Sequence, residues 1–331
     1  MIRDGILQEG KADLPAIRQW IDNRMPDIVR DLTRICRIRS VAEAEASQYP
    51  PFGKGCRDVL EEMLHIGEEN GFLVQNFDNY VGKISYAASP QADTIGIWAH
   101  LDVVEEGEGW EYEPYDPVVK DGYFIARGCQ DNKSSAILGL YVLKYMKEHH
   151  ISLSHGLELY LGTCEEQGMY DLDYYVAHYR LPALSLVPDS GFPVCCGERG
   201  SFNAELISRR ECGKELLEVS CDCGLYTIPD QARAVLAYSG ERWEKASRLS
   251  APVTAERVGE TIRIIAHGVR AHASRPADGV NALTLLAQAL CTQELIDGEN
   301  RELFGIIPAI NQDNTGPVSY THLTLPTIYS V

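Results

Sequence analysis

The sequence has few basic side chains for its length. Its 331 residues carry 30 Lys and Arg against 48 Asp and Glu, a formal net charge of −18. An excess of negative charge repels polyphosphate chains and anionic lipid headgroups. We therefore expect neither nucleic acid nor a membrane surface as a partner of this chain.

Long apolar runs and paired cysteine motifs are lacking as well. No run approaches the roughly 20 residues of a membrane span, and residues 1–10 are charged, without the apolar core of an export signal. The ten cysteines are scattered, and Cys221 and Cys223 do not have the spacing of a structural zinc pair. We expect a cytoplasmic protein whose thiols are reduced and buried.

Apolar runs of strand length, separated by helical periodicity, predict an α/β fold. Residues 95–99, 156–163 and 184–187 are expected as strands, and residues 135–146 as a helix. A strand, turn and strand hinged on Asp121 lie between the first of these strands and the helix. The chain is long enough for one or two domains with a sizeable core.

Acidic or imidazole side chains follow each of the three strands. His100 and Asp102 come after the first strand and share a face, because side chains two apart on a strand point the same way. Open α/β sheets bind ligands at the carboxyl ends of their strands. The candidate ligands, an imidazole and three carboxylates suited to Zn²⁺, Mn²⁺ or Co²⁺, are His100, Asp131, Glu166 and Asp189.

Five ordered segments carry a family resemblance: HLDVV, ARGCQDNK, TCEEQG, VPDSGFP and GVRAHASRPADGVNA. Together they resemble the co-catalytic zinc peptidases and deacylases of the ArgE/DapE/PepV type, most nearly the dipeptidase V branch. The resemblance covers about residues 27–316. It implies a catalytic domain with a mixed central sheet flanked by helices, an inserted α+β lid domain, two bound divalent metal ions, most simply Zn²⁺, and a small peptide substrate.

The resemblance also implies a role for each site residue. Asp131 bridges two metals, His100 and Asp189 complete one site, and Glu166 belongs to the other. Glu165 is the general base, and Asp102 holds His100 in the right tautomer. From the lid, His272 donates to the oxyanion of the intermediate. The peptide bond between Asp131 and Asn132 is expected to be cis.

The resemblance divides the chain into a metal-binding catalytic domain at 1–198, an incomplete lid at 199–316 and a non-native tail at 317–331. Residues 1–15 are expected to be an irregular lead-in, with a helix beginning at Pro26. The lid is expected to contain strands at 201–208, 216–221 and 259–266 and helices at 231–247 and 279–290.

The family's last metal ligand is a histidine that we expect beyond this chain, because His322 lies in the foreign-looking tail. The chain is therefore expected to be inactive as it stands and, by resemblance, monomeric. Two other functions remain open. An N-acyl amino acid deacylase would use the same water activation with a different pocket. A truncated, non-catalytic metal-binding fragment is the third possibility.

Overall fold

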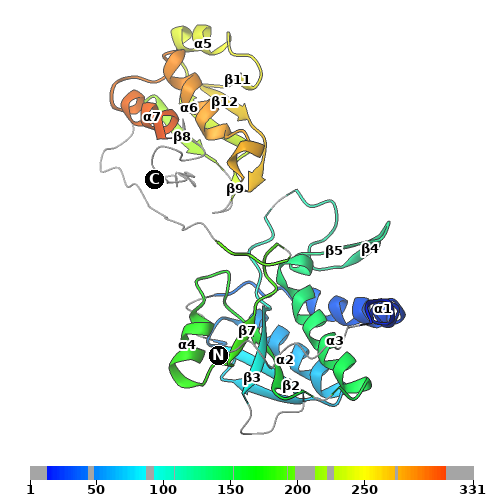
Figure 1. Ribbon diagram of the computed structural model, residues 1–331. Coiled ribbons are helices and arrows are strands. Elements are labelled where there is room, and N and C mark those ends of the chain that lie inside the picture. The colour runs from blue at the N-terminus through cyan, green and yellow to red at the C-terminus, as the bar shows by residue number, and fades with distance from the viewer. Residues whose placement is uncertain are drawn as a thin grey trace. The chain divides into compact units, whose positions relative to one another are not determined.

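The computed structural model describes residues 13–43, 48–86, 93–107, 109–151, 153–191, 193–197, 213–221, 227–272 and 275–310. They belong to two compact units, Met1–Cys196 and Gly197–Val331, each with its own hydrophobic core (Figure 1). The predicted boundary between residues 198 and 199 and the predicted tail at 317–331 lie outside the described residues.

The first unit is organised on a five-stranded sheet with the order β1-β2-β6-β3-β7. Its strands are β1 (Leu73–Phe77), β2 (Val81–Tyr86), β3 (Thr94–His100), β6 (Gly156–Gly162) and β7 (Leu184–Leu186). The β1-β2 and β2-β6 pairs are antiparallel, whereas β3 runs parallel to both β6 and β7. The predicted mixed central sheet is therefore confirmed, and three of the four candidate ligands, His100, Glu166 and Asp189, lie at or after the ends of its parallel strands.

Helices cover this sheet on both faces. α1 (Leu14–Cys36), α2 (Lys54–Glu69) and α3 (Ser134–Glu148) share one core with alternate residues of β6, Leu157, Leu159 and Leu161. On the other face, Tyr160 stacks on Trp98 with ring centroids 4.2 Å apart and packs with Tyr175 of α4 (Tyr170–His178). The strand alternation thus separates an aliphatic layer from an aromatic one.

Helix α1 starts earlier than predicted. Asp13 caps it by accepting a hydrogen bond from the Ala16 amide at 3.0 Å, and Pro15 stands in the first turn. An aspartate cap followed by proline favours a helix start here, although the polar composition of residues 1–15 suggested an irregular segment. Pro26, predicted to begin the helix, instead lies inside it.

One buried carboxylate is compensated within the sheet. Glu158 of β6 lies 2.9 Å from the Lys83 ammonium and accepts a hydrogen bond from the Tyr160 hydroxyl. Burial by itself would raise the pKa of Glu158, but these two partners outweigh it and lower that pKa below its usual value. The carboxylate is therefore stabilised as an anion.

A small hairpin of β4 (Val118–Lys120) and β5 (Tyr123–Ile125) confirms the predicted strand, turn and strand. Asp121 and Gly122 both have positive φ, 51° and 84°. This is the conformation that a two-residue hairpin turn requires at both central positions. The hairpin lies between the end of β3 and the turn that carries Asp131.

The second unit is an α+β arrangement. An antiparallel sheet has the order β11-β12-β10-β8, and β9 pairs with β13. Its strands are β8 (Leu216–Ser220), β9 (Thr227–Ile228), β10 (Gln231–Ala237), β11 (Val253–Val258), β12 (Thr261–His267) and β13 (Ala271–His272). Its helices are α5 (Gly240–Ala246), α6 (Ala282–Thr292) and α7 (Gly298–Ile310).

The predicted helix at 231–247 is wrong. Its first half is β10, in which Ala232, Ala234 and Leu236 are buried in alternation, and only its second half is the helix α5. The alanines of this segment favour a helix, but β10 pairs with β12 on one side and β8 on the other, and this pairing outweighs the helix propensity. The strand predicted at 201–208 lies outside the described residues.

The cysteines among the described residues form no disulfide, but they are not all buried as predicted. Cys36, Cys56, Cys164 and Cys221 are buried, whereas the adjacent Cys195 and Cys196 are exposed. Burial raises the pKa of the Cys36 thiol to about 12. Among the described residues, no helix combines the length and the apolar composition needed to cross a membrane.

Candidate metal centre

Three parallel strand ends bring the candidate ligands to one edge of the sheet. His100 is the last residue of β3, Glu165 and Glu166 follow β6, and Asp189 follows β7. Because these strands run in the same direction, their carboxyl ends meet. Asp131 reaches the same place from the turn at Cys129–Lys133, just before α3. The edge predicted from the sequence is the one that gathers them.

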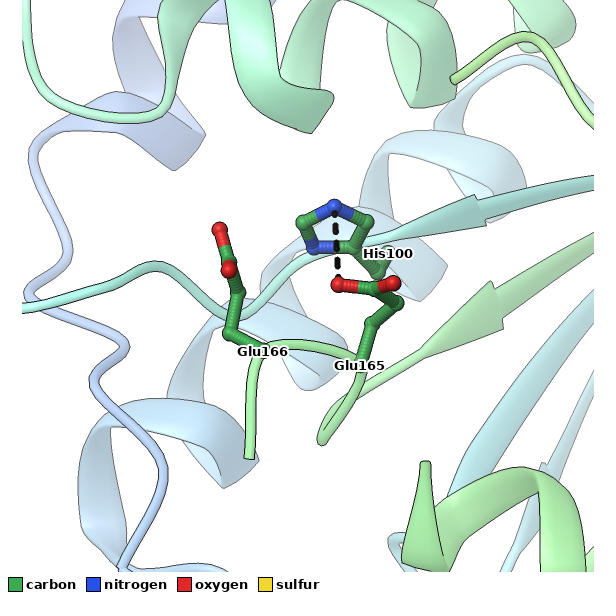
Figure 2. Close-up of side chains that lie close together, drawn as sticks. All are labelled: His100, Glu165 and Glu166. Atoms are coloured by element: carbon green, nitrogen blue, oxygen red, sulfur yellow. Dashed lines mark ion pairs between the residues drawn. The ribbon is translucent and has the colours of Figure 1, made fainter. Parts of the chain in front are cut away.

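His100 is the centre of this cluster. Its side chain is 4% exposed, and its Nε2 lies 3.0 Å from Asp131 Oδ1 and 3.4 Å from Asp189 Oδ2. Figure 2 shows His100 facing Glu165, whose Oε2 is 3.9 Å from the same nitrogen, with Glu166 on the adjoining turn. Burial lowers the pKa of His100, but hydrogen bonds with the surrounding aspartates outweigh it and raise that pKa.

Two groups of side chains here have the geometry of a metal site. One is His100, Glu165 and Glu166, and the other is His100, Asp131 and Asp189; within each, ligand atoms lie within 4.8 Å of one another. All four predicted ligands are present, and His100 is common to both groups. The resemblance instead implies that Asp131 is the ligand shared by two metals and that Glu165 is not a ligand. These two roles of Asp131 and Glu165 stay proposals.

Electrostatics in the cluster favour a bound cation. Burial, followed by the charge of Asp131, raises the pKa of Glu166 to about 7, and burial also raises the pKa of Glu165. The hydrogen bond with His100 lowers the pKa of Asp189. Several carboxylates around one imidazole resist full ionisation unless positive charge is added. Oxygen donors with one imidazole suit Zn²⁺ and Mn²⁺, so the residues fit a divalent metal.

Asp102 has a different set of partners from the one predicted. The backbone carbonyl of Asp102, not its carboxylate, is the nearer partner of His100 Nδ1, at 3.0 Å against 3.4 Å. The fully buried carboxylate accepts hydrogen bonds from the backbone amides of Glu165 and Glu166, both at 3.0 Å. Asp102 thus fixes the acidic pair as well as the imidazole.

Asn132 joins the turn at Cys129–Lys133 to the residues that follow β7, a contact that no sequence pattern predicted. Its side-chain amide donates to Asp189 Oδ1 at 2.6 Å and to the Pro188 carbonyl at 3.1 Å. The Ser135 hydroxyl donates to the same carbonyl at 2.8 Å. The peptide bond between Asp131 and Asn132 is cis, as the resemblance predicted.

His272 belongs to the second unit. It lies on β13 and pairs with Thr227 of β9, and its side chain is exposed. Its predicted action on the substrate stays a proposal. His322 lies outside the described residues.

The amino-acid sequence matches a known peptidase family. The sequence pattern of "Peptidase family M20/M25/M40" matches residues 96–291. "Putative dipeptidase YtjP" of Bacillus subtilis is 30% identical over 302 residues, which cover 88% of this chain and 65% of that protein. "Putative dipeptidase" of Staphylococcus epidermidis is 30% identical over 289 residues, 83% of this chain and 60% of that protein.

A solved structure, the dipeptidase Dug1p from Saccharomyces cerevisiae, is similar at 17% identity with a TM-score of 0.45. That similarity covers 69% of this chain and 47% of the yeast chain. The chain thus spans under two thirds of the length of each of these three proteins.

Proposed function

Because the chain belongs to the peptidase family M20/M25/M40, we propose that it takes part in the hydrolysis of dipeptides or short peptides by a pair of divalent metal ions. The observation that supports this most is the convergence of two ligand groups on His100 at the ends of three parallel strands. The relatives named as dipeptidases favour a short peptide over a protein substrate.

The metal ligands are assigned as follows. His100 and Asp189 would hold one cation, Glu166 the other, and Asp131 would contact both. The side chain of Asp131 is 67% exposed, so this carboxylate can be reached from solvent. Zn²⁺ suits this donor set best, and Mn²⁺ or Co²⁺ would also bind. When bound, such a pair lowers the pKa of a water molecule and polarises the scissile carbonyl.

Glu165 would act as the general base. It takes a proton from the attacking water and delivers it to the leaving amine. Burial raises the pKa of this carboxylate, which makes it a better proton acceptor than an exposed glutamate. Its backbone amide is held by Asp102, so the carboxylate starts from a fixed position. His272 would donate a hydrogen bond to the oxyanion.

Two substitutions on adjacent residues separate base from ligand. In a form of the protein that carries the expected last histidine ligand, Glu165→Gln should lower kcat by about 10²–10⁴ with metal content preserved, since it removes proton transfer alone. Glu166→Gln should instead release metal. Glu105→Gln, on an exposed residue of the loop after β3, is the control and should change neither. Metal content is measured by atomic emission after gel filtration. Equal metal loss in both variants would show that Glu165 is a ligand.

The substrate class needs a separate test. Ala-containing and Xaa-His dipeptides are offered beside N-acetyl and N-succinyl amino acids, and release of free amine is followed. Cleavage of the dipeptides supports the proposal. Exclusive cleavage of the acyl amino acids would replace it with a deacylase, whose water activation is the same. Metal binding without cleavage of any of these substrates, in a form of the protein that carries the expected last histidine ligand, would refute both.

A further inference from the structure

The turn that carries Glu165 and Glu166 is held by its backbone. Four consecutive amides, those of residues 163–166, all donate to buried carboxylates. Asp102 accepts the last two, as described above. Asp171 accepts the first two through Oδ2, from Thr163 at 2.7 Å and Cys164 at 3.0 Å. No motif in the sequence marked Asp171.

We propose that Asp171 is a positioning residue for the metal centre: together with Asp102 it clamps the turn after β6, so that the two glutamates face His100. The inference rests on the proposed function, because it concerns the placement of that function's base and ligand. Asp171 touches neither glutamate side chain in any described contact and acts through the main chain.

The environment of Asp171 indicates a dedicated use of its charge. It is 3% exposed, and among the described residues it forms no ion pair. Its partners are the two turn amides and the amide of Leu172, which donates to Oδ1 at 2.8 Å. A buried carboxylate is costly unless it is hydrogen-bonded, and bonds from amides to an anion are the strong kind.

Gly162 supplies a second, independent observation. A Cβ built on this residue would lie 2.5 Å from Asp171 Oδ2, closer than any side chain can come. The last residue of β6 therefore has to be glycine for the carboxylate to reach the turn. The Thr163 hydroxyl also donates to the carbonyl of Tyr80, the residue before β2, at 2.8 Å. This hydrogen bond links the turn to the start of β2.

The direct test is Asp171→Asn, with Asp173→Asn as the matched control. Asp173 is in the same helical turn of α4 but exposed. In the metal-free protein, hydrogen exchange at the amides of Thr163 and Cys164 should accelerate by about tenfold or more in Asp171→Asn, because an amide nitrogen replaces one of the acceptor oxygens. The control should leave exchange unchanged.

Metal affinity is the second readout. Asp171→Asn should weaken binding of Zn²⁺, measured by titration calorimetry, by about 10–100-fold, the usual effect of losing a group that orients a ligand. In a form of the protein that cleaves dipeptides, kcat should fall more than KM rises. If Asp171→Asn only lowers the melting temperature, while exchange at the turn and Zn²⁺ affinity match the control, the inference is overturned.

Gly162→Ala covers the case in which Asp171→Asn does not fold. The added methyl group should displace the carboxylate and reproduce the faster exchange. Added to Asp171→Ala, the same glycine substitution should have little further effect, because its clash partner is gone; full additivity would contradict the inference. If the wild-type protein binds no metal, the proposed function fails, whereas exchange at residues 163 and 164 still decides whether Asp171 holds the turn.

Discussion

Replacing Lys133 with methionine should destabilise the first unit, although methionine fills nearly the same space. The Lys133 side chain is fully buried, and its ammonium donates to the carbonyls of Ile35 at 3.0 Å and Ile38 at 2.9 Å. Ile35 is in the last turn of α1, where helical carbonyls lack partners within the helix, and Ile38 follows the end of that helix. Lys133 thus joins the turn that carries Asp131 to the end of α1.

The expected loss is a difference between two terms. Two hydrogen bonds from a charged donor contribute about 3–6 kcal/mol. Burial lowers the pKa of Lys133 from 10.5 to about 8, which corresponds to a cost of about 3 kcal/mol for removing the charged ammonium from water. Methionine removes both terms, a difference of about 0–3 kcal/mol, and leaves two carbonyls without their donor. A buried carbonyl that water cannot reach costs about 1–3 kcal/mol more, so Lys133→Met should lower the free energy of unfolding by at least about 1 kcal/mol.

Lys147 is the matched control. Its ammonium makes the same kind of contact, with the carbonyls of Asn70 at 2.9 Å and Gly71 at 2.7 Å after α2, but the side chain is exposed. Water replaces a lost donor there, so Lys147→Met should cost about 0.5 kcal/mol or less. Urea unfolding followed by tryptophan fluorescence and circular dichroism measures both. Equal losses in the two variants, or a Lys133→Met protein as stable as wild type, would refute the reasoning.

Three further predictions concern other parts of the chain. Glu158→Gln should lower the melting temperature at pH 7, and the difference should shrink as the pH falls below the unfolded pKa of about 4.3 and on through the folded pKa, because the depressed folded pKa of Glu158 stabilises the fold only while the carboxylate is charged. Iodoacetamide at pH 8 should modify Cys195 and Cys196 in the folded protein and Cys36 only in urea, as peptide mass mapping would reveal. Gly268→Ala should destabilise the second unit by about 3 kcal/mol in urea unfolding, because its Cβ would lie 2.0 Å from a backbone carbonyl oxygen; an unchanged midpoint would contradict this.

The sequence allowed the ligand-bearing edge of the sheet to be predicted because two strong signals coincide there. Short apolar runs mark β3, β6 and β7, and each run is followed within two residues by a charged or imidazole side chain. Only the parallel arrangement of these strands had to be assumed for His100, Glu166 and Asp189 to converge. The β10 segment lacked such a signal, since alanine alternating with larger residues suits a helix and a buried strand alike.

The residues that support the site were harder to identify, for a physical reason. Asp102 and Asp171 act on backbone amides, and every residue except proline offers an amide, so the partner leaves no mark in the sequence. Their burial distinguishes them only after folding: both are under 4% exposed, whereas the side chain of the candidate ligand Asp131 is 67% exposed. Exposure therefore separates the two proposed kinds of carboxylate in this cluster: Asp102 and Asp171 are buried, whereas the side chains of Asp131 and of Glu165, at 34%, are accessible to solvent.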